Sequence, residues 1–216
     1  MKTIDFNTAT IINDQELLRE LFFCDSIFLS EMSSVTFSGQ ISLGANLKFS
    51  GKCIFNSGCI IDDGSIISNA IFGNNCHIRP YSLISDTQSG DENIIGPFSF
   101  VRDNTFIENN SIMGAHTEIV RSKISSNVKI SHRAFIADAN ISENVIIGAG
   151  VIFCNFNGEK KCISSISKNV TVGSGSLIIS PVVIGEFSTI AAGSVVNKDI
   201  KANKKFIQKR ESLEIL

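Results

Sequence analysis

The chain has 216 residues, a formal net charge of −2 at pH 7 and 43% hydrophobic residues. This length suits one domain with a sizeable core, and the nearly balanced charge gives no general electrostatic case for binding nucleic acid. No run approaches the roughly 18 apolar residues of a membrane helix, the opening MKTIDFNTAT does not resemble a signal peptide, and the six cysteines form no CxxC pair, so we expect a cytoplasmic protein without a membrane or metal site.

Residues 1–34 lie outside any repeat and are expected to form an N-terminal helical segment. The stretch NDQELLRELFF predicts a short amphipathic helix, with Asn13 or Asp14 as its cap. Its apolar face is predicted to consist of Leu17, Leu18, Leu21 and Phe22.

From residue 35 to residue 198, an apolar residue recurs about every six positions. This period fits neither a helix nor a simple strand, but it is typical of a parallel β-helix whose coils of roughly 18 residues stack on one another. The series predicted to fill the interior is Phe37, Leu43, Phe49, Phe55, Ile61, Ile67, Phe72, Ile78, Ile84, Ile95, Val101, Ile107, Met113, Ile119, Ile124, Ile130, Ile136, Ile141, Ile147, Phe153, Val172, Ile178, Ile184, Ile190 and Val196. Cys53, Cys59 and Cys76 fall in the small inward slots beside this series, where we expect packing rather than chemistry.

Two segments depart from the repeat. The stretch CNFNGEKKCISS, residues 154–165, is too long for one six-residue unit, and a loop that leaves a regular solenoid is a candidate functional segment. The alternative is a tolerated surface insertion. Residues 199–216 are expected to form a basic C-terminal arm.

The repeat also predicts which outward side chains lie near each other. Arg102 and Val120 are expected to share one column, and Phe135 is expected to stack over Glu118. His132 is placed near a corner, at the same edge as Glu118, where a carboxylate could orient an imidazole for general base catalysis. The alternative for His132 is a solvated surface histidine.

Four segments carry a resemblance to a known family. They are IGPFSFVRDNT (95–105), SHRAFIADANI (131–141), IGAGVIFCNFNGEKK (147–161) and VTVGSGSLIISPVVIGEFSTIAAGSVV (170–196). Together they resemble the acetyltransferase domain of the bacterial bifunctional glucosamine-1-phosphate acetyltransferases/uridylyltransferases of the GlmU type, whose nucleotidyltransferase half has no counterpart in this sequence. The resemblance implies an all-β, left-handed parallel β-helix, acetyl-CoA as co-substrate without a metal, an amino-sugar acceptor, and a homotrimer with active sites between subunits.

The resemblance also implies roles for individual residues. His132 matches the catalytic base and Glu118 the acidic residue associated with it. Arg102 matches a ligand of the sugar phosphate. The remaining matched positions are Asn155 and Lys161 near the acceptor, Ala149, Ser174 and Ala192 along the coenzyme A channel, and Lys209 with Arg210 at the coenzyme A end of the arm.

Four acceptor positions depart from the family pattern. Val120 replaces a phosphate-binding lysine, Phe135 and Phe156 replace tyrosines, and Ile146 replaces an asparagine. Each lost charged or polar contact is worth about 1–3 kcal/mol. We therefore expect an acceptor other than glucosamine-1-phosphate, unless Arg121 or His116 compensates.

Two other functions compete with this prediction. A catalytically degenerate scaffolding or regulatory protein would have lost the acceptor contacts, and binding of coenzyme A would separate the two. A hexapeptide metalloprotein of the carbonic anhydrase kind needs three histidines on one metal. His77 is too many coils from His116 and His132 for that arrangement.

Overall fold

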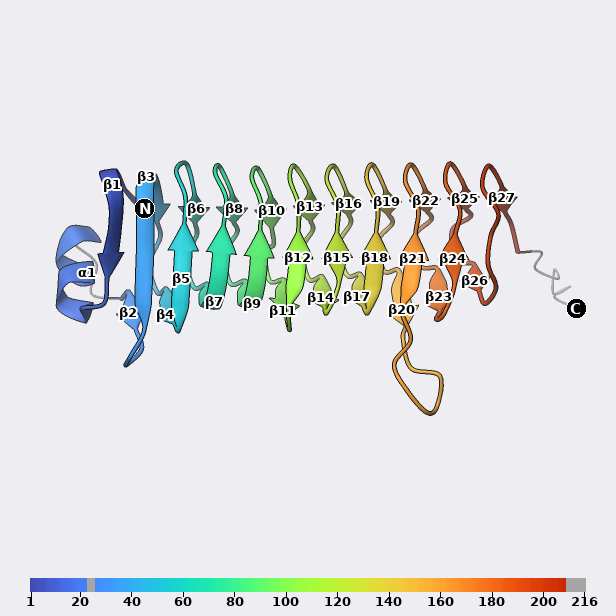
Figure 1. The fold of residues 1–216 in the computed structure, drawn as a ribbon, viewed down its shortest axis with the longest axis horizontal. Helices are drawn as coiled ribbons and strands as arrows, with labels where there is room; N and C mark the ends of the chain where they lie inside the picture. The colour runs from blue at the N-terminus through green and yellow to red at the C-terminus, as the bar shows by residue number, and fades with distance from the viewer. Residues whose placement is uncertain (23–25, 209–216) are drawn as a thin grey trace, which may run out of the picture.

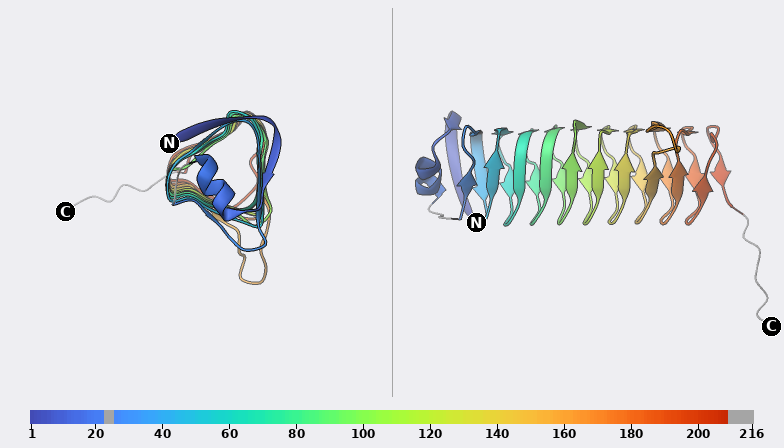
Figure 2. Two further views of the ribbon diagram at one scale, coloured as in Figure 1. Left: turned by 90° about the vertical axis from the view of Figure 1, so that its left-hand side faces the viewer. Right: turned by 90° about the horizontal axis from the view of Figure 1, so that it is seen from below.

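The structure is a computed structural model that describes residues 1–22 and 26–208. The chain winds into a parallel β-solenoid of about ten coils, which stack along one long axis (Figure 1). Viewed down that axis, the coils superpose as a three-sided prism (Figure 2). The predicted fold class, an all-β left-handed parallel β-helix, is confirmed.

The strands form three faces, which we name A, B and C in the order in which they follow one another within a coil that begins on face A. Face A contains β6 (Ile60–Ile61), β8 (His77–Ile78), β10 (Ile94–Ile95), β13 (Ile112–Met113), β16 (Lys129–Ile130), β19 (Ile146–Ile147), β22 (Thr171–Val172), β25 (Thr189–Ile190) and β27 (Lys205–Phe206). Face B contains β2 (Phe28–Leu29), β4 (Lys48–Ser50), β11 (Phe100–Arg102), β14 (Glu118–Val120), β17 (Phe135–Ala137), β20 (Ile152–Cys154), β23 (Leu177–Ile179) and β26 (Val195–Val196).

Face C contains β5 (Lys52–Phe55), β12 (Thr105–Ile107), β15 (Lys123–Ile124), β18 (Ala139–Ile141), β21 (Ser164–Ile166) and β24 (Val183–Ile184). Three longer strands turn a corner and serve two faces: β3 (Ser34–Leu43) joins faces C and A, and β7 (Ile66–Phe72) and β9 (Leu83–Ser89) join faces B and C. The AB corner lies between faces A and B, and the BC corner between faces B and C.

The interior of the prism holds the predicted apolar series. Every residue of that series is at most 2% exposed. In the N-terminal half the interior is aromatic: the rings of Phe37 and Phe55 lie 5.7 Å apart, and those of Phe55 and Phe72 lie 5.3 Å apart and nearly parallel. Such stacked pairs add to the free energy gained by burying the rings.

Small residues fill the narrow slots beside this series, as predicted. Cys53, Cys59 and Cys76 are buried, and burial raises the pKa of the Cys53 thiol, which therefore remains protonated. Polar members of the same slots donate to main-chain oxygens: Ser82 Oγ to Arg79 O at 2.8 Å and Thr105 Oγ1 to Arg102 O at 2.7 Å. Their burial is thereby compensated.

The N-terminal segment is not simply helical, which corrects the prediction. Strand β1 (Lys2–Ile12) precedes helix α1 (Gln15–Phe22) and pairs antiparallel with β3. The helix begins as predicted, because Asp14 Oδ1 accepts from the Leu17 N–H at 2.9 Å. Together β1 and α1 cover the first coil, where an open strand edge would otherwise expose unpaired main-chain groups. The solenoid itself starts before residue 35, because Phe28 and Leu29 already pair with Lys48 and Phe49.

The repeat also extends beyond residue 198. Ile200 bridges to Ile184, and β27 pairs with β25, so residues assigned to an arm complete a further coil. The predicted loop spans residues 155–163, between β20 and β21, and projects from the prism (Figure 1). Within the described ranges, helix length and hydropathy fall short of what crossing a bilayer requires.

The aromatic interior generates a stability prediction. Phe55→Ala should lower the free energy of unfolding by about 3–5 kcal/mol, because it removes a buried ring stacked on both sides. Phe106→Ala, on the exposed surface of face C, should cost less than about 1 kcal/mol. Denaturant unfolding of both variants measures the difference. Equal losses would contradict the assignment of Phe55 to the interior.

Candidate active site

His132 lies at the AB corner, between β16 and β17, and its side chain is exposed. Main-chain hydrogen bonds connect this corner from coil to coil. Gly150 N donates to His132 O at 3.0 Å, Gly175 N to Ala149 O at 2.8 Å, and Gly193 N to Ser174 O at 2.8 Å. His132 therefore belongs to a column that continues through Ala149 and Ser174 toward the C-terminal end and through Ala115 and Pro97 toward the N-terminal end.

The adjacent column of this corner, which contains His116, Arg133 and Gly150, changes character beside His132. On its C-terminal side, residues 148–150, 173–175 and 191–193 of the corner carry only small side chains, and Cβ atoms added at Gly150 and Gly175 would meet open space. On its N-terminal side the corner carries stacked rings: Tyr81 and Phe98 at 5.3 Å, and Phe98 and His116 at 5.1 Å. His132 thus lies next to the point where the rings of the AB corner give way to small residues, and we name residues 148–150, 173–175 and 191–193 of this corner the slim edge.

Ala149, Ser174 and Ala192, the positions matched to the coenzyme A channel, occupy this slim edge. Ala149 N donates to Ser174 Oγ at 3.2 Å, and a Cβ added at Gly173 would lie 2.4 Å from Ala192 N. The three residues therefore follow one another along the axis, in line with His132. Lys209 and Arg210, predicted to serve the same ligand, lie outside the described residues.

Glu118 lies on face B, and Phe135 stacks directly over it as predicted. Its carboxylate does not take the predicted partner: among the described contacts, Glu118 Oε1 accepts from Arg102 Nη2 at 2.7 Å and from Arg102 Nε at 3.3 Å. Arg102 comes from the adjoining coil, two positions further along its strand, and is long enough to reach back across face B. The predicted hydrogen bond between His132 and Glu118 is absent from these contacts.

A continuous set of ion pairs runs from Glu118 to the BC corner. Arg102 Nη1 lies 2.6 Å from Asp103 Oδ2, and Arg121 Nη1 lies 3.2 Å from the same oxygen. Arg121 also binds both carboxylate oxygens of Asp138, at 2.7 and 3.0 Å. We name these five residues the ionic chain. Each arginine in it contacts two carboxylates.

The loop is attached to the end of the ionic chain. Asn155 Nδ2 donates to Asp138 Oδ2, and the positive charge of Lys161 helps to lower the pKa of Asp138. Phe156, by contrast, is exposed, and its main chain bridges to Lys161 across the loop. Arg102, Asn155 and Lys161 thus gather around the BC corner.

Asp138 is the most enclosed charge of this group, with 12% of its side chain exposed. The hydrogen bonds from Arg121 hold its pKa below the ordinary value, and the bond from Asn155 acts in the same direction. Burial opposes this shift but does not reverse it. Asp138 therefore stays ionised and anchors both Arg121 and the loop.

The acceptor residues that depart from the family pattern do not share one surface. Val120 was expected to face the surface, but it is only 1% exposed. It lies between Arg102 and Ala137 in its column, outside the interior series and beside the residues of the ionic chain. Phe135 is half-buried on face B, whereas Ile146 is 45% exposed on face A. A prism corner therefore separates Ile146 from Phe135 and Arg102.

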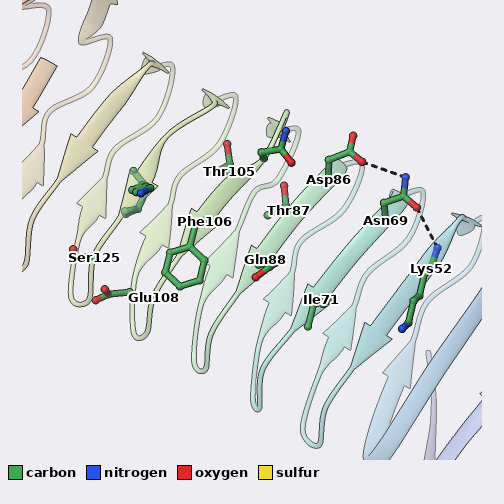
Figure 3. Close-up of a pocket in the computed structure, with 13 residues that line it drawn as sticks. Lys52, Asn69, Ile71, Asp86, Thr87, Gln88, Thr105, Phe106, Glu108 and Ser125 are labelled. Atoms are coloured by element: carbon green, nitrogen blue, oxygen red, sulfur yellow. Dashed lines mark hydrogen bonds between the residues drawn. The ribbon is translucent and has the colours of Figure 1, made fainter. Parts of the chain in front are cut away.

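A surface groove of about 710 Å³ lies elsewhere, on face C. Ile71, Gln88 and Phe106 lie side by side on successive strands in it, and Lys52 and Glu108 are among its charged residues (Figure 3). Its lining contains no histidine and none of the predicted site residues. The AB and BC corners, rather than this groove, carry the candidate catalytic chemistry.

Comparison with known proteins identifies the repeat. The family described as bacterial transferase hexapeptide (six repeats) matches residues 164–198. The bifunctional protein GlmU of Psychrobacter arcticus is 39% identical over 181 residues, which are 84% of this chain and 40% of that protein. The chain carries a transferase hexapeptide-repeat domain. GlmU of Baumannia cicadellinicola is 35% identical over 204 residues, which are 94% of this chain and 40% of that protein.

The hexapeptide-repeat domain spans about 40% of the length of these curated relatives and corresponds to their C-terminal domain. A solved structure described as Arabidopsis UDP-N-acetylglucosamine acyltransferase is similar in fold, with a TM-score of 0.54. The two are 16% identical, and the match covers 82% of this chain and 67% of that one. The family assignment supports an acyltransferase.

Sequence reasoning missed two residues of this site, Asp103 and Asp138. Each comes directly after a strand of face B and has a left-handed backbone, with φ of 57° for Asp103 and 51° for Asp138. The signal available in the sequence was that the repeat places Asp103, Arg121 and Asp138 at the same corner of adjoining coils. Carboxylates placed there meet guanidinium groups from the coil above or below.

The hydrogen bonds that Arg121 donates to Asp138 predict a pH dependence. Asp138→Asn should lower the free energy of unfolding by about 1–3 kcal/mol at pH 7, since it removes charged hydrogen bonds. Because the folded-state pKa is depressed, this contribution is present above the ordinary value near 4 and is lost as pH falls through the lower folded value. Unfolding curves from pH 7 to pH 2.5 should therefore converge at the acid end. Asp86→Asn, whose carboxylate contacts Asn69 rather than an arginine, is the control.

The burial of Val120 predicts that restoring the family lysine is costly. Val120→Lys should destabilise the fold by about 2–4 kcal/mol, because an ammonium group would enter a covered position beside Arg102. Ile146→Asn, at an exposed position, should change stability by less than about 1 kcal/mol. Thermal or chemical unfolding compares the two. A stable Val120→Lys variant would show that the groups that bury residue 120 move aside at little cost in free energy.

Proposed function

We propose that this domain is an acetyl-CoA-dependent N-acetyltransferase that acts on the amino group of a sugar or sugar derivative. His132 is the general base. Acetyl-CoA lies along the slim edge of the AB corner, and the acceptor lies over face B toward the BC corner. The observation that carries the proposal is the exposed His132 beside the slim edge, in a hexapeptide-repeat domain related to GlmU.

The slim edge suits a long, narrow co-substrate. Ala149, Gly150, Ser174 and Gly175 present little side-chain bulk, so a pantetheine arm can approach the main chain closely. The rings of Phe98 and His116 close the same edge on the other side of His132. A thioester lying on the slim edge would therefore end beside the imidazole.

The proposed reaction is a direct transfer. The lone pair of the acceptor nitrogen attacks the thioester carbonyl carbon while His132 takes the proton from that nitrogen. The tetrahedral intermediate then collapses, the carbon–sulfur bond breaks, and coenzyme A leaves as a thiolate that is protonated to the thiol. Arg102 contacts only Oε1 of Glu118, which leaves Oε2 to accept from the imidazole or from a hydroxyl of the acceptor.

A homotrimer is part of the proposal. Ile146 matches an acceptor position but lies on face A, across a corner from Phe135 and Arg102. A neighbouring subunit that packs along the AB corner would bring face A of one prism toward face B of the next. Face B also carries a column in which exposed Leu83, Phe100 and Ile152 lie on either side of Glu118 and Phe135, and such packing would cover these apolar residues.

A catalytically degenerate scaffold is the second candidate. The observation in its favour is that Arg102 and Glu118, both assigned to the active site by resemblance, bind each other. A scaffold would have no reason to bind coenzyme A. Calorimetric titration with coenzyme A therefore separates the candidates, because saturable binding is expected only of the enzyme.

His132→Ala tests the base assignment. We expect it to reduce acetyl transfer about 10²–10⁴-fold while it leaves coenzyme A affinity within about twofold, because the side chain is exposed and supports no packing. Release of free thiol from acetyl-CoA, measured with a panel of amino sugars, their 1-phosphates and their UDP derivatives, gives the rate. His77→Ala is the matched control, since His77 lies on face A three coils before His132 and pairs with Asp62.

The outcomes differ clearly. Wild-type turnover in His132→Ala would refute the assignment of the base. An equal loss in His77→Ala would point to a general effect on folding. Absence of transfer by the wild-type protein with every acceptor, combined with absence of coenzyme A binding, would favour the scaffold.

A further inference from the structure

We propose that the acceptor side of this site is closed to phosphate by its own carboxylates, and that Asp103 is the residue that determines this specificity. The acceptor is then an amino sugar rather than a sugar phosphate. Its free amine is either the sole charged group of the sugar or is accompanied by a further cationic group. This inference rests on the proposed function, because it concerns the acceptor of the same site.

The charge of the ionic chain is the first observation. Its three carboxylates and two guanidinium groups leave one net negative charge. A sugar phosphate that approaches Arg102 therefore meets Glu118 and Asp103 at the same place. An ammonium group, the form in which a sugar amine arrives at neutral pH, is attracted instead.

The geometry of Asp103 is the second observation. One of its oxygens, Oδ2, lies 2.6 Å from Arg102 Nη1 and 3.2 Å from Arg121 Nη1, so a single carboxylate occupies both arginines. This is the position that a phosphate oxygen would take between two guanidinium groups. The carboxylate of Asp103 thus acts as a permanent anion of the chain itself at this position.

Two further donors of the BC corner, Arg121 and Asn155, are committed to Asp138, and the charge of Lys161 acts on the same carboxylate. The other side of Arg121 binds Asp138 through two hydrogen bonds, and Asn155 donates to the same carboxylate. Val120, at the position of the family lysine, adds no charge. Carboxylates with a spare lone pair, such as Glu118 and Asp103, are suited to accept from the hydroxyl groups of an uncharged sugar.

Asp103→Asn isolates this effect. The amide removes one negative charge and tolerates the left-handed backbone of the position, so both arginines are released without a change of shape. Asp86→Asn is the matched control: Asp86 lies at the same corner one coil below, has a φ of 46°, and contacts Asn69 rather than an arginine.

The measurement is calorimetric titration without acetyl-CoA, using glucosamine-1-phosphate and glucosamine as probes. We expect the wild-type protein to bind glucosamine-1-phosphate no more tightly than glucosamine. Asp103→Asn should bind the phosphate at least about tenfold more tightly than wild type does, and Asp86→Asn should behave as wild type. Adding Arg102→Ala to Asp103→Asn should abolish the gain. The ratio of acetyl transfer to the two sugars should shift in the same direction.

Three results would overturn the inference. The first is that the wild-type protein prefers glucosamine-1-phosphate, including a preference that depends on Arg133 beside His132. The second is that Asp86→Asn gains as much affinity for the phosphate as Asp103→Asn does. The third is that Asp103→Asn gains no affinity although its unfolding curve is normal. If Asp103→Asn does not fold, Glu118→Gln, which releases the other partner of Arg102, must give the gain. The binding data stand even if no sugar is acetylated, so failure of the proposed function is recognised separately.

Discussion

The stacking of each coil on the one below is the constraint on which the rest of this structure depends. Parallel pairing holds equivalent positions of adjoining coils in register, as Glu118 with Phe135 and Arg102 with Val120 show. The apolar residue of each unit must then lie inside, since a large polar side chain there would be buried without a hydrogen-bond partner. Outward residues are forced into columns, and each column becomes a strip of surface with its own chemistry.

The candidate site uses two such strips for opposite purposes. At the AB corner, glycine and alanine leave the main chain accessible next to His132. At the BC corner, arginine and aspartate alternate between coils and bind one another, and the loop is fixed to them through Asn155. Access for a thioester and control of acceptor charge are thereby separated onto two edges of one prism, with face B between them.

The period-six pattern was sufficient to predict the interior, the column shared by Arg102 and Val120, and the position of Phe135 over Glu118. It failed at the ends, where β1 and the coil that ends at β27 are specified by edge pairing rather than by the repeat. It also failed for Val120, because the repeat predicts the direction of a side chain and not whether neighbouring groups cover it. The partner of Glu118 was missed for a related reason: register specifies neighbours at the main chain, whereas flexible side chains select their partners beyond it.

The main-chain ladder has a mechanical consequence. Strands in this prism lie across the long axis, so the hydrogen bonds between coils, such as Gly150 N to His132 O, run along it. A force that pulls the two ends of the solenoid apart breaks the hydrogen bonds of one coil boundary after another instead of all of them together. Resistance to stretching is then set by a single coil boundary, and the molecule yields by peeling from one end, however many coils it contains.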